Sequence, residues 1–272
     1  MWKDSKKAPI GEFLGWLWLI LIVSNASAFL LEHYSIAYAE NGTLTVGYIF
    51  YAIIGILFCT PSPMLAIFIT LKRHRKIGTV GDFCKLIFHT PNRKKAIMIT
   101  GAFCTAALCA ALVQGVPTGS PWYLMVIALP VMIIGGGVEE IGWRGFLQPE
   151  LEKKYPFPLA TIMVSLIWYP WHLPIWLLPS SNHYGDSLIG FGITIFVWSF
   201  IGAAIYKATK SVFACVMYHA FVNSIGAIFD WNALFDKFPN HPGMYVYYGI
   251  ALIASIALWI FADKKEKRNQ SQ

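Results

Sequence analysis

Two adjacent carboxylates and an arginine interrupt an apolar run in the middle of the chain. Glu139, Glu140 and Arg144 follow the uncharged stretch 122–134 through three consecutive glycines. In a helix, Glu140 and Arg144 share one face with the acid N-terminal, the favourable order for an ion pair. Glu139 is rotated by about 100° from that face. The spacing therefore predicts a structural Glu140–Arg144 pair and a Glu139 free for chemistry; a helix end solvated by lipid headgroups is the alternative.

Of the seven histidines, His172 and His219 are the two that lie inside apolar runs. Pro170 and Pro174 flank His172, and broken backbone at membrane depth is tolerated where it is buried in protein or lines a cavity. His219 and Asn223 share one helix face, four residues apart. Ionisable groups in apolar runs need polar partners. We therefore expect the acids, the histidines and the asparagine to line one cavity.

Such a cavity would hold the equipment for attack of water on a carbonyl carbon. Glu139 is the candidate general base, and His172 is a second group that can handle protons. His219 and Asn223 are candidate donors to a developing oxyanion. A divalent metal such as zinc is the competing account, with Glu139, His172 and His219 as ligands. No HExxH motif is present, and asparagine beside histidine suits an oxyanion better, which favours water activation without a metal.

The composition indicates an integral membrane protein. Hydrophobic residues make up 57% of the 272 residues and charged residues only 13%, whereas soluble domains carry about 25% charged residues. A helix that spans a bilayer needs about 20 apolar residues. The sequence therefore predicts an all-α polytopic membrane protein, with eight transmembrane helices around an intramembrane polar cavity. The expected spans are 13–31, 46–71, 96–116, 122–141, 158–178, 188–206, 212–229 and 244–262.

The basic residues predict the orientation of this layout. All 21 lysines and arginines except Lys237 fall on the side that carries both termini. Cytoplasmic loops are enriched in lysine and arginine, so both termini are expected in the cytoplasm, with the protein in the plasma membrane. The net charge of +7 then reflects topology beside anionic lipid rather than nucleic-acid binding. Glu139 falls near the cytoplasmic end of its span, which predicts a cavity open to the cytoplasmic leaflet.

The connections and ends of the chain carry weaker signals. Pro61 and Pro63 should bend or split the second span. In the loop 72–95, the segment 80–88 mixes apolar and basic residues like an interfacial helix, and an ordinary basic loop is the alternative. The charged end 264–272 is expected to be disordered. The first span lacks a convincing processing site, so we expect it to remain as a helix. The five cysteines show no CxxC spacing, which favours small buried side chains over disulfides or zinc ligands.

Three motifs resemble those of a known family, the CPBP intramembrane proteases. This family includes the type II CAAX prenyl endopeptidases and bacterial relatives labelled Abi. It shows EExxxR, FxxxH and HxxxN/D on separate membrane helices, and here the matching runs are 139–144, 168–172 and 219–223, in the same order. The departure is Trp168, where the family has phenylalanine, an aromatic exchange that we expect to reshape the pocket and leave the chemistry intact. The resemblance covers about residues 120–230.

The resemblance implies an endopeptidase that acts on a membrane-associated or prenylated peptide or protein. Glu139 and His172 would activate water, and His219 with Asn223 would stabilise the oxyanion. The family name says metalloprotease, and the sequence leaves a metal cofactor open. The competing class is a non-catalytic membrane binding protein, such as a bacteriocin immunity factor or a transporter-like scaffold.

We expect one integral membrane domain over residues 1–272, embedded in the lipid bilayer and without nucleic-acid partners. The motif-bearing core would cover about 120–230. Residues 1–115 would form variable helices for packing and substrate entry, and residues 263–272 would form a cytoplasmic tail.

Overall fold

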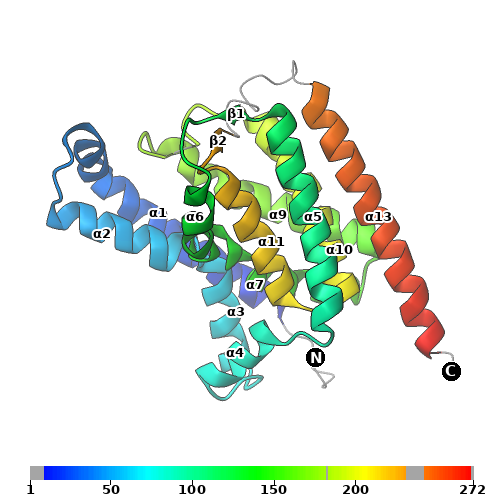
Figure 1. Ribbon diagram of the computed structural model, residues 1–272. Coiled ribbons are helices and arrows are strands. Elements are labelled where there is room, and N and C mark those ends of the chain that lie inside the picture. Colours follow the sequence, from blue (N-terminus) through cyan, green and yellow to red (C-terminus); the bar gives the residue numbers. More distant parts are fainter. Residues whose placement is uncertain (1–8, 182, 231–241, 271–272) are drawn as a thin grey trace.

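The structure, a computed structural model, describes residues 9–181, 183–230 and 242–270. Within these ranges the regular elements are helices apart from one two-stranded pairing (Figure 1), which confirms the predicted all-α membrane class. The expected basic residues Lys3, Lys6, Lys7 and Lys237 lie outside the described residues. The longer helices are α1 (Ile10–Asn41), α5 (Arg93–Gln114), α9 (Phe157–His172), α10 (Leu188–Thr209), α11 (Val212–Ile225) and α13 (Pro242–Gln270). The shorter elements are α2 (Val46–Ile54), α3 (Ser62–Arg73), α4 (Val80–Phe88), α6 (Tyr123–Met132), α7 (Glu139–Gly142), α8 (Gln148–Glu152), β1 (Val116–Pro117) and β2 (Phe229–Asp230).

Several of these helices are long and apolar enough to cross a membrane. In the described part of the chain, α1, α5, α10 and α13 meet this test singly. Two bent pairs raise the number to six: α2 with α3, and α6 with the α7–α8 segment. α9 has 16 residues and α11 has 14, so both are shorter than a straight span. The predicted number of eight spans therefore stays a prediction.

Proline accounts for the break in the second predicted span. α2 continues as a π-helical segment to Cys59, and α3 then leaves at 54° after Pro61. This confirms the expected bend, because the proline ring removes a backbone donor and clashes with the preceding turn. In α9, by contrast, the helix continues through Pro170 and tightens into a 3₁₀ segment only after His172.

Large apolar side chains cover the outside of the bundle. Ile22 is 63% exposed, Leu30 is 74% exposed and Ile253 is 70% exposed. Apolar surface on this scale is rare in monomeric soluble proteins and marks contact with a membrane or a partner. Together with the long apolar helices, it identifies an integral membrane protein.

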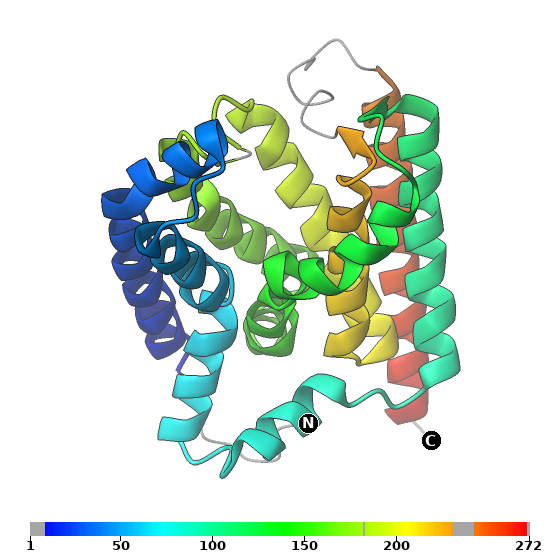
Figure 2. The same ribbon diagram turned by 60° about the vertical axis from the view of Figure 1, so that its left-hand side comes forward.

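The bundle has two chemically different ends, which we call the basic end and the sheet end. At the basic end Lys207 pairs with Glu152 and Glu266, which ties together the ends of α8, α10 and α13. At the sheet end β1 pairs with β2 in antiparallel fashion. Figure 1 shows α4 and the C-terminal end of α13 at one end of the molecule and the two strands at the other. Figure 2 shows the same separation in a second view.

The C-terminal segment differs from the prediction. α13 remains helical to Gln270, so the expected disorder from residue 264 is wrong for the residues described there. Salt bridges explain the order, because Lys267 pairs with Asp263 at 2.9 Å and Lys210 pairs with Glu266 at 3.3 Å. The charged end is therefore docked on α10.

The segment 80–88 forms α4, which favours the interfacial-helix alternative over a basic loop. Thr79 and Asp82 form a reciprocal capping box at its start. The backbone and hydroxyl donors of Thr79 hold the pKa of Asp82 below its usual value. Phe83 and Ile87 point inward, and Phe83 contacts Phe68 of α3 with ring centroids 5.2 Å apart.

Candidate active site

The EExxxR run lies on a helix that two π-helical segments interrupt. Ile133–Gly137 and Trp143–Leu147 adopt this wider turn, and α7 with Glu139 and Glu140 lies between them. The helix direction also changes by 42° between Gly137 and Glu139. π-helical turns are rare and occur frequently at functional sites. Both acids are buried in the structure.

Glycines let the neighbouring helices approach this segment closely. A Cβ atom at Gly136 would lie 2.3 Å from Nδ2 of Asn223 and 3.0 Å from Nε2 of His219. A Cβ atom at Gly142 would lie 2.8 Å from the backbone carbonyl carbon of Pro63. The distances of 2.3 Å and 2.8 Å are shorter than packed atoms tolerate. The missing side chains therefore allow α11 and α3 to pack directly on the motif helix.

Glu140 and Arg144 are in contact, as their spacing predicts. Nη1 of Arg144 lies 3.0 Å from Oε1 and 2.9 Å from Oε2 of Glu140, and both side chains are buried. Nη2 donates to the carbonyl oxygens of Trp198 and Ser199 on α10. Gly202 makes room for the guanidinium, because a Cβ there would lie 2.7 Å from Nε. The arginine thus joins the motif helix to α10.

Glu140 has a second partner that the spacing did not indicate. Nδ1 of His219 lies 2.9 Å from Oε1 of Glu140, with both side chains buried. A carboxylate only accepts hydrogen bonds, so His219 donates from Nδ1 and its Nε2 is left facing Gly136 and Asn223. Glu140 therefore orients a histidine in addition to pairing with Arg144.

Glu139 points away from the ion pair and towards α9. Its Oε2 accepts a hydrogen bond from Nε1 of Trp168 at 2.8 Å and lies 3.9 Å from Nε2 of His172. Nδ1 of His172 lies 3.1 Å from the backbone oxygen of Trp168. Because that carbonyl only accepts, Nδ1 carries the proton in this contact and the lone pair of Nε2 faces Glu139. Both facing atoms are thus hydrogen-bond acceptors.

Trp168 contacts more of this constellation than its place in a motif suggested. Besides bonding Glu139, its ring lies 4.8 Å below the guanidinium carbon of Arg144, within cation–π range. Its ring centroid is 5.7 Å from that of His219 and 5.8 Å from that of His172. The comparison with the family motif predicts that this exchange of phenylalanine for tryptophan leaves the chemistry intact. An indole N–H is, however, a donor that phenylalanine lacks.

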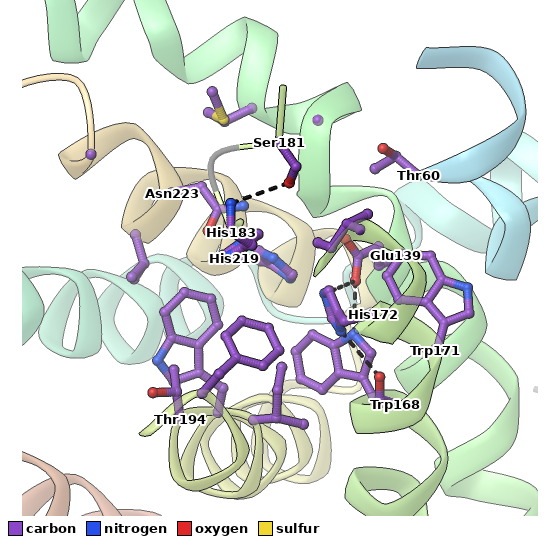
Figure 3. A pocket seen from close by; sticks show the side chains of 18 of the residues that line it. Thr60, Glu139, Trp168, Trp171, His172, Ser181, His183, Thr194, His219 and Asn223 are labelled. Carbon is purple, nitrogen blue, oxygen red and sulfur yellow. Dashed lines mark hydrogen bonds and ion pairs between the residues drawn. The ribbon is translucent and has the colours of Figure 1, made fainter. Parts of the chain in front are cut away.

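A cavity of about 710 Å³ lies over these groups (Figure 3). Glu139, His172, His219 and Asn223 all line it, so the structure brings the four predicted catalytic residues to one space. The volume falls within the range typical of ligand pockets. Its walls also include apolar and aromatic side chains, among them Trp171. The cavity can therefore bind an apolar segment next to a polar centre.

Two groups of cavity residues have no signal in the motifs. Asn25 of α1 and Thr60, between α2 and α3, bring the first third of the chain to the cavity wall. His183 lines the cavity from the connection between α9 and α10. Its Nδ1 lies 2.9 Å from Oδ2 of Asp186, and its ring stacks on Trp176 at 5.0 Å. The sequence places His183 in a loop, and this position gave no reason to expect it near His172.

The same connection is tied to α1 by a buried acid. Oε1 of Glu32 accepts a hydrogen bond from the backbone nitrogen of Ser180 at 2.6 Å. The hydroxyl groups of Ser180 and Tyr51 lie 3.0 Å apart. A buried acid in a membrane helix is energetically costly, and here its bond fixes the backbone three residues before His183.

The predicted opening of the cavity to the cytoplasmic leaflet stays a prediction, and among the described residues the cavity lining extends towards the sheet end. Its lining residues Thr118, Ser181, His183 and Asp230 belong to connections or to β2 at the sheet end. The prediction considered only the depth of Glu139 in its own helix. How far the cavity extends depends on how the connections at both ends pack, which that depth does not determine.

The described side chains do not form a metal site. No group of three His, Cys, Asp or Glu side chains among them has the arrangement needed to hold a metal ion. In the predicted set, Glu139 bonds Trp168, and His219 turns its Nδ1 to Glu140. Glu139, His172 and His219 therefore surround a shared cavity without forming a ligand set.

Comparisons with known proteins agree with the three motifs. Residues 120–225 match the family model described as type II CAAX prenyl endopeptidase Rce1-like. The curated protein "CAAX prenyl protease 2" of Methanococcus maripaludis is 26% identical over 106 residues. These residues are 36% of this chain and 39% of that relative, so the similarity spans about two fifths of the relative's length. The predicted family resemblance is confirmed.

Proposed function

Since the motif-bearing part of this chain belongs to the Rce1-like, type II CAAX prenyl endopeptidase family, we propose that the protein is an intramembrane endopeptidase. Its substrate is a membrane-associated peptide or protein, and its reaction is hydrolysis of a peptide bond by activated water. The observation that carries the proposal is the 3.9 Å separation of Oε2 of Glu139 and Nε2 of His172 at the wall of one cavity.

This separation suits one water molecule bound to both groups. A water that donates a hydrogen bond of about 2.8 Å to each atom can bridge this 3.9 Å separation, with the two acceptors about 90° apart at its oxygen. Its oxygen lone pair is then free to attack a carbonyl carbon in the cavity. As the C–O bond forms, Glu139 takes one proton, and the carbonyl π electrons move to the oxygen. The second proton stays on the new hydroxyl group, which donates a hydrogen bond to Nε2 of His172.

The resulting oxyanion needs donors on the opposite side of the carbonyl. Nδ2 of Asn223 and Nε2 of His219 both lie beside Gly136, and the Asn223 amide is a suitable donor. Because Nδ1 of His219 already donates to Glu140, its Nε2 donates as well only when the ring carries both protons, as an imidazolium beside that carboxylate. When the tetrahedral intermediate collapses, the C–N bond breaks and the leaving nitrogen takes the proton from Glu139. Glu140 and Arg144 serve as the framework, because they hold His219 and α10 in place.

The proposed layout in the plasma membrane has eight spans with both termini in the cytoplasm. It is supported by the six long or bent apolar spans, by α9 and α11 between them, and by the gathering of basic residues at one end. Reporter fusions after Asn41 should score as external and fusions after Arg75 as internal. An internal score after Asn41 would contradict this layout.

The activity is tested with purified protein and a library of membrane-associated and prenylated peptides, with fragments identified by mass spectrometry. We expect the wild type to release fragments and Glu139→Gln to release none while remaining folded. Glu40→Gln, an exposed acid on α1, is the matched control and should match the wild type. Reactions with and without a chelator show whether a metal takes part. Equal cleavage by wild type and Glu139→Gln would refute the proposed base.

The non-catalytic alternative, an immunity factor or scaffold, has less support. A binding protein has no need for a carboxylate and an imidazole 3.9 Å apart with their acceptor atoms facing one another. The family similarity also points to a protease. Tight peptide binding without any cleavage would favour this alternative.

A further inference from the structure

The connection between α9 and α10 supplies polar groups to the cavity that the proposed reaction does not use. We call its residues 178–181 and 183–187 the strap. Ser181 and His183 of the strap line the cavity together with the catalytic candidates. The backbone nitrogen of His183 donates to Oγ of Ser181 at 3.1 Å, the contact drawn between these two residues in Figure 3. The strap therefore brings two linked polar residues to the cavity wall.

Contacts within this region hold the His183 ring in one orientation. Its Nδ1 lies 2.9 Å from Oδ2 of Asp186, and its ring stacks on Trp176 with centroids 5.0 Å apart. Nε1 of Trp176 also donates to the backbone oxygen of Asp186 at 3.1 Å. Because a carboxylate only accepts hydrogen bonds, Nδ1 carries the proton in this pair. Nε2 is thus the nitrogen left for a ligand, and 21% of the side chain is exposed to receive one.

Ser181 and His183 together complement a peptide backbone. Oγ of Ser181 already accepts from the backbone nitrogen of His183, so its hydroxyl hydrogen is free to donate. Nε2 of a neutral imidazole accepts. One donor and one acceptor two positions apart match the carbonyl and N–H groups of an extended chain, and main-chain hydrogen bonds are a common source of affinity for extended peptides.

The strap also lies next to the catalytic centre. The Phe191 ring contacts both His183 and His172, with ring centroids 5.1 Å and 4.9 Å apart. The two histidines therefore pack on one aromatic ring. A peptide that binds to the strap is then held beside the histidine that faces Glu139.

A buried acid of α1 anchors the strap from outside. Oε1 of Glu32 accepts a hydrogen bond from the backbone nitrogen of Ser180 at 2.6 Å, and the hydroxyl groups of Ser180 and Tyr51 lie 3.0 Å apart. Hydrogen bonds to an ionised acceptor are short and strong. Ser180 directly precedes Ser181, so this bond fixes the chain where the cavity contacts begin.

We propose that the strap binds the main chain of the substrate through Ser181 and His183, and that Glu32 is the positioning residue that holds it in place. The ligand is an extended peptide segment, recognised by its backbone groups. The identity of the ligand rests on the proposed hydrolytic function. Glu32 lies outside residues 120–225, which match the family model, so the first helix contributes to substrate affinity.

The anchor is tested by replacing Glu32 in purified protein in detergent. Glu32→Leu removes the acceptor and should raise KM by about 10-fold or more, the scale for the loss of two hydrogen bonds to a ligand, while kcat changes little. Glu32→Gln keeps an acceptor for Ser180 and should stay close to the wild type. Glu40→Leu, at an exposed position of the same helix, is the matched control. Equal KM values for wild type and Glu32→Leu, or equal losses in Glu32→Leu and Glu32→Gln, would overturn the role of Glu32.

Two further measurements keep this test decisive if Glu32→Leu folds poorly. Tyr51→Phe removes the hydroxyl group beside Ser180 and should raise KM in the same direction by a smaller factor. Amide hydrogen exchange of the strap should be faster in both variants and unchanged in Glu32→Gln. Unchanged exchange in both variants would show that the strap is not held from α1.

A double-mutant cycle tests whether Glu32 acts through the strap. The background Ser181→Ala/His183→Gln removes the proposed substrate contacts. In it, Glu32→Leu should raise KM further by less than about 2-fold, because residues that act through one interaction are not additive. A rise as large as in the wild type would show that Glu32 acts elsewhere.

Backbone recognition is tested with peptides in which an ester oxygen replaces one N–H group at a time. The parent probe is the library peptide that Glu139→Gln binds most tightly, with Kd measured by fluorescence anisotropy on that non-cleaving variant. One ester should raise Kd by about 5-fold, the scale of one neutral hydrogen bond, and should have no effect in the Ser181→Ala/His183→Gln background. Equal ester effects in both backgrounds would overturn the proposal.

The binding measurement also separates this inference from the proposed function. Dependence of Kd on the strap, with no cleavage of any peptide by the wild type, would uphold the strap and refute hydrolysis. Cleavage with KM values that are insensitive to Glu32, Ser181 and His183 would refute the strap and leave hydrolysis standing.

Discussion

Nδ1 of His219 lies 2.9 Å from Oε1 of Glu140, so the acid that pairs with Arg144 also holds a histidine of the candidate site. The two adjacent glutamates thus have different partners. Glu139 faces Trp168 and His172, and Glu140 faces Arg144 and His219. The division of roles between the acids follows from their different directions on one short helix.

Replacement of Glu140 should lower both stability and activity. In Glu140→Ala, Arg144 stays buried without its carboxylate, which costs about 3–5 kcal/mol of unfolding free energy when one partner of a buried pair is removed. The double variant Glu140→Leu/Arg144→Met should recover most of this stability, since apolar pairs often replace buried ion pairs at no cost. Its activity should stay low, because His219 has lost its partner. Thermal unfolding in detergent and peptide cleavage measure the two effects, and full activity in the double variant would contradict the role given to Glu140.

Trp168→Phe should lower kcat with little change in KM. The substitution keeps an aromatic ring under Arg144 but removes the indole N–H that bonds Oε2 of Glu139. Hydrogen bonds to charged groups contribute about 1.5–3 kcal/mol, so we expect a loss of about 10-fold or more in kcat. Trp171→Phe is the matched control, because its indole bonds Ser62 instead. Equal kcat values for both variants would show that the bond to Glu139 has no positioning role.

Gly136→Ala should disturb the proposed oxyanion donors. The new methyl group would meet Nδ2 of Asn223 at 2.3 Å and Nε2 of His219 at 3.0 Å. One of the two side chains must move, so we expect kcat to fall by about 100-fold, the usual scale for loss of an oxyanion donor. Gly135→Ala lies beside it in the same π-helical segment and would meet only Met132 at 3.6 Å. It controls for helix propensity and should keep near-normal kcat; comparable losses in both would refute the donor assignment.

His183→Gln should raise KM and leave kcat nearly unchanged. His183 lines the cavity, but its bonded partner is Asp186 and its stacking partner is Trp176. It is therefore placed to contact the substrate rather than the attacking water. The exposed His89→Gln at the basic end serves as the control. Steady-state kinetics with one fluorogenic peptide separates the two constants, and a large drop in kcat alone would place His183 in the chemistry.

Some of this structure follows from the sequence, and the rest depends on contacts between distant segments. Apolar runs predicted the helices, and the four-residue spacing predicted the contact of Glu140 with Arg144, because both are local properties of one helix. The bond of Glu140 to His219 joins residues 79 positions apart, and no local pattern indicates it. The hydrogen bond of Trp168 was overlooked because the residue was compared with phenylalanine by size and aromaticity.

The extent of the cavity could not be predicted for a related reason. The depth of Glu139 along its own helix was read as the location of the opening. The connections that carry Thr118 and His183 instead extend the cavity to the sheet end, and their fold depends on anchors such as the bond from Ser180 to Glu32. Connections of this kind are set by tertiary contacts rather than by hydrophobic periodicity.

The close contact between Gly142 and Pro63 limits how this protein can be recombined. The similarity to the prenyl endopeptidase family covers residues 120–225, which suggests a catalytic unit with an exchangeable N-terminal part. Yet a single methyl group at position 142 would collide with the backbone of α3, and Asn25 and Thr60 form part of the cavity wall. The N-terminal helices and the motif-bearing core therefore depend on each other for close packing. A chimaera that joins this core to the first helices of a relative would need a kink at the position of Pro61. Without that kink, the helix that carries Glu139 and Gly142 could not pack against α3.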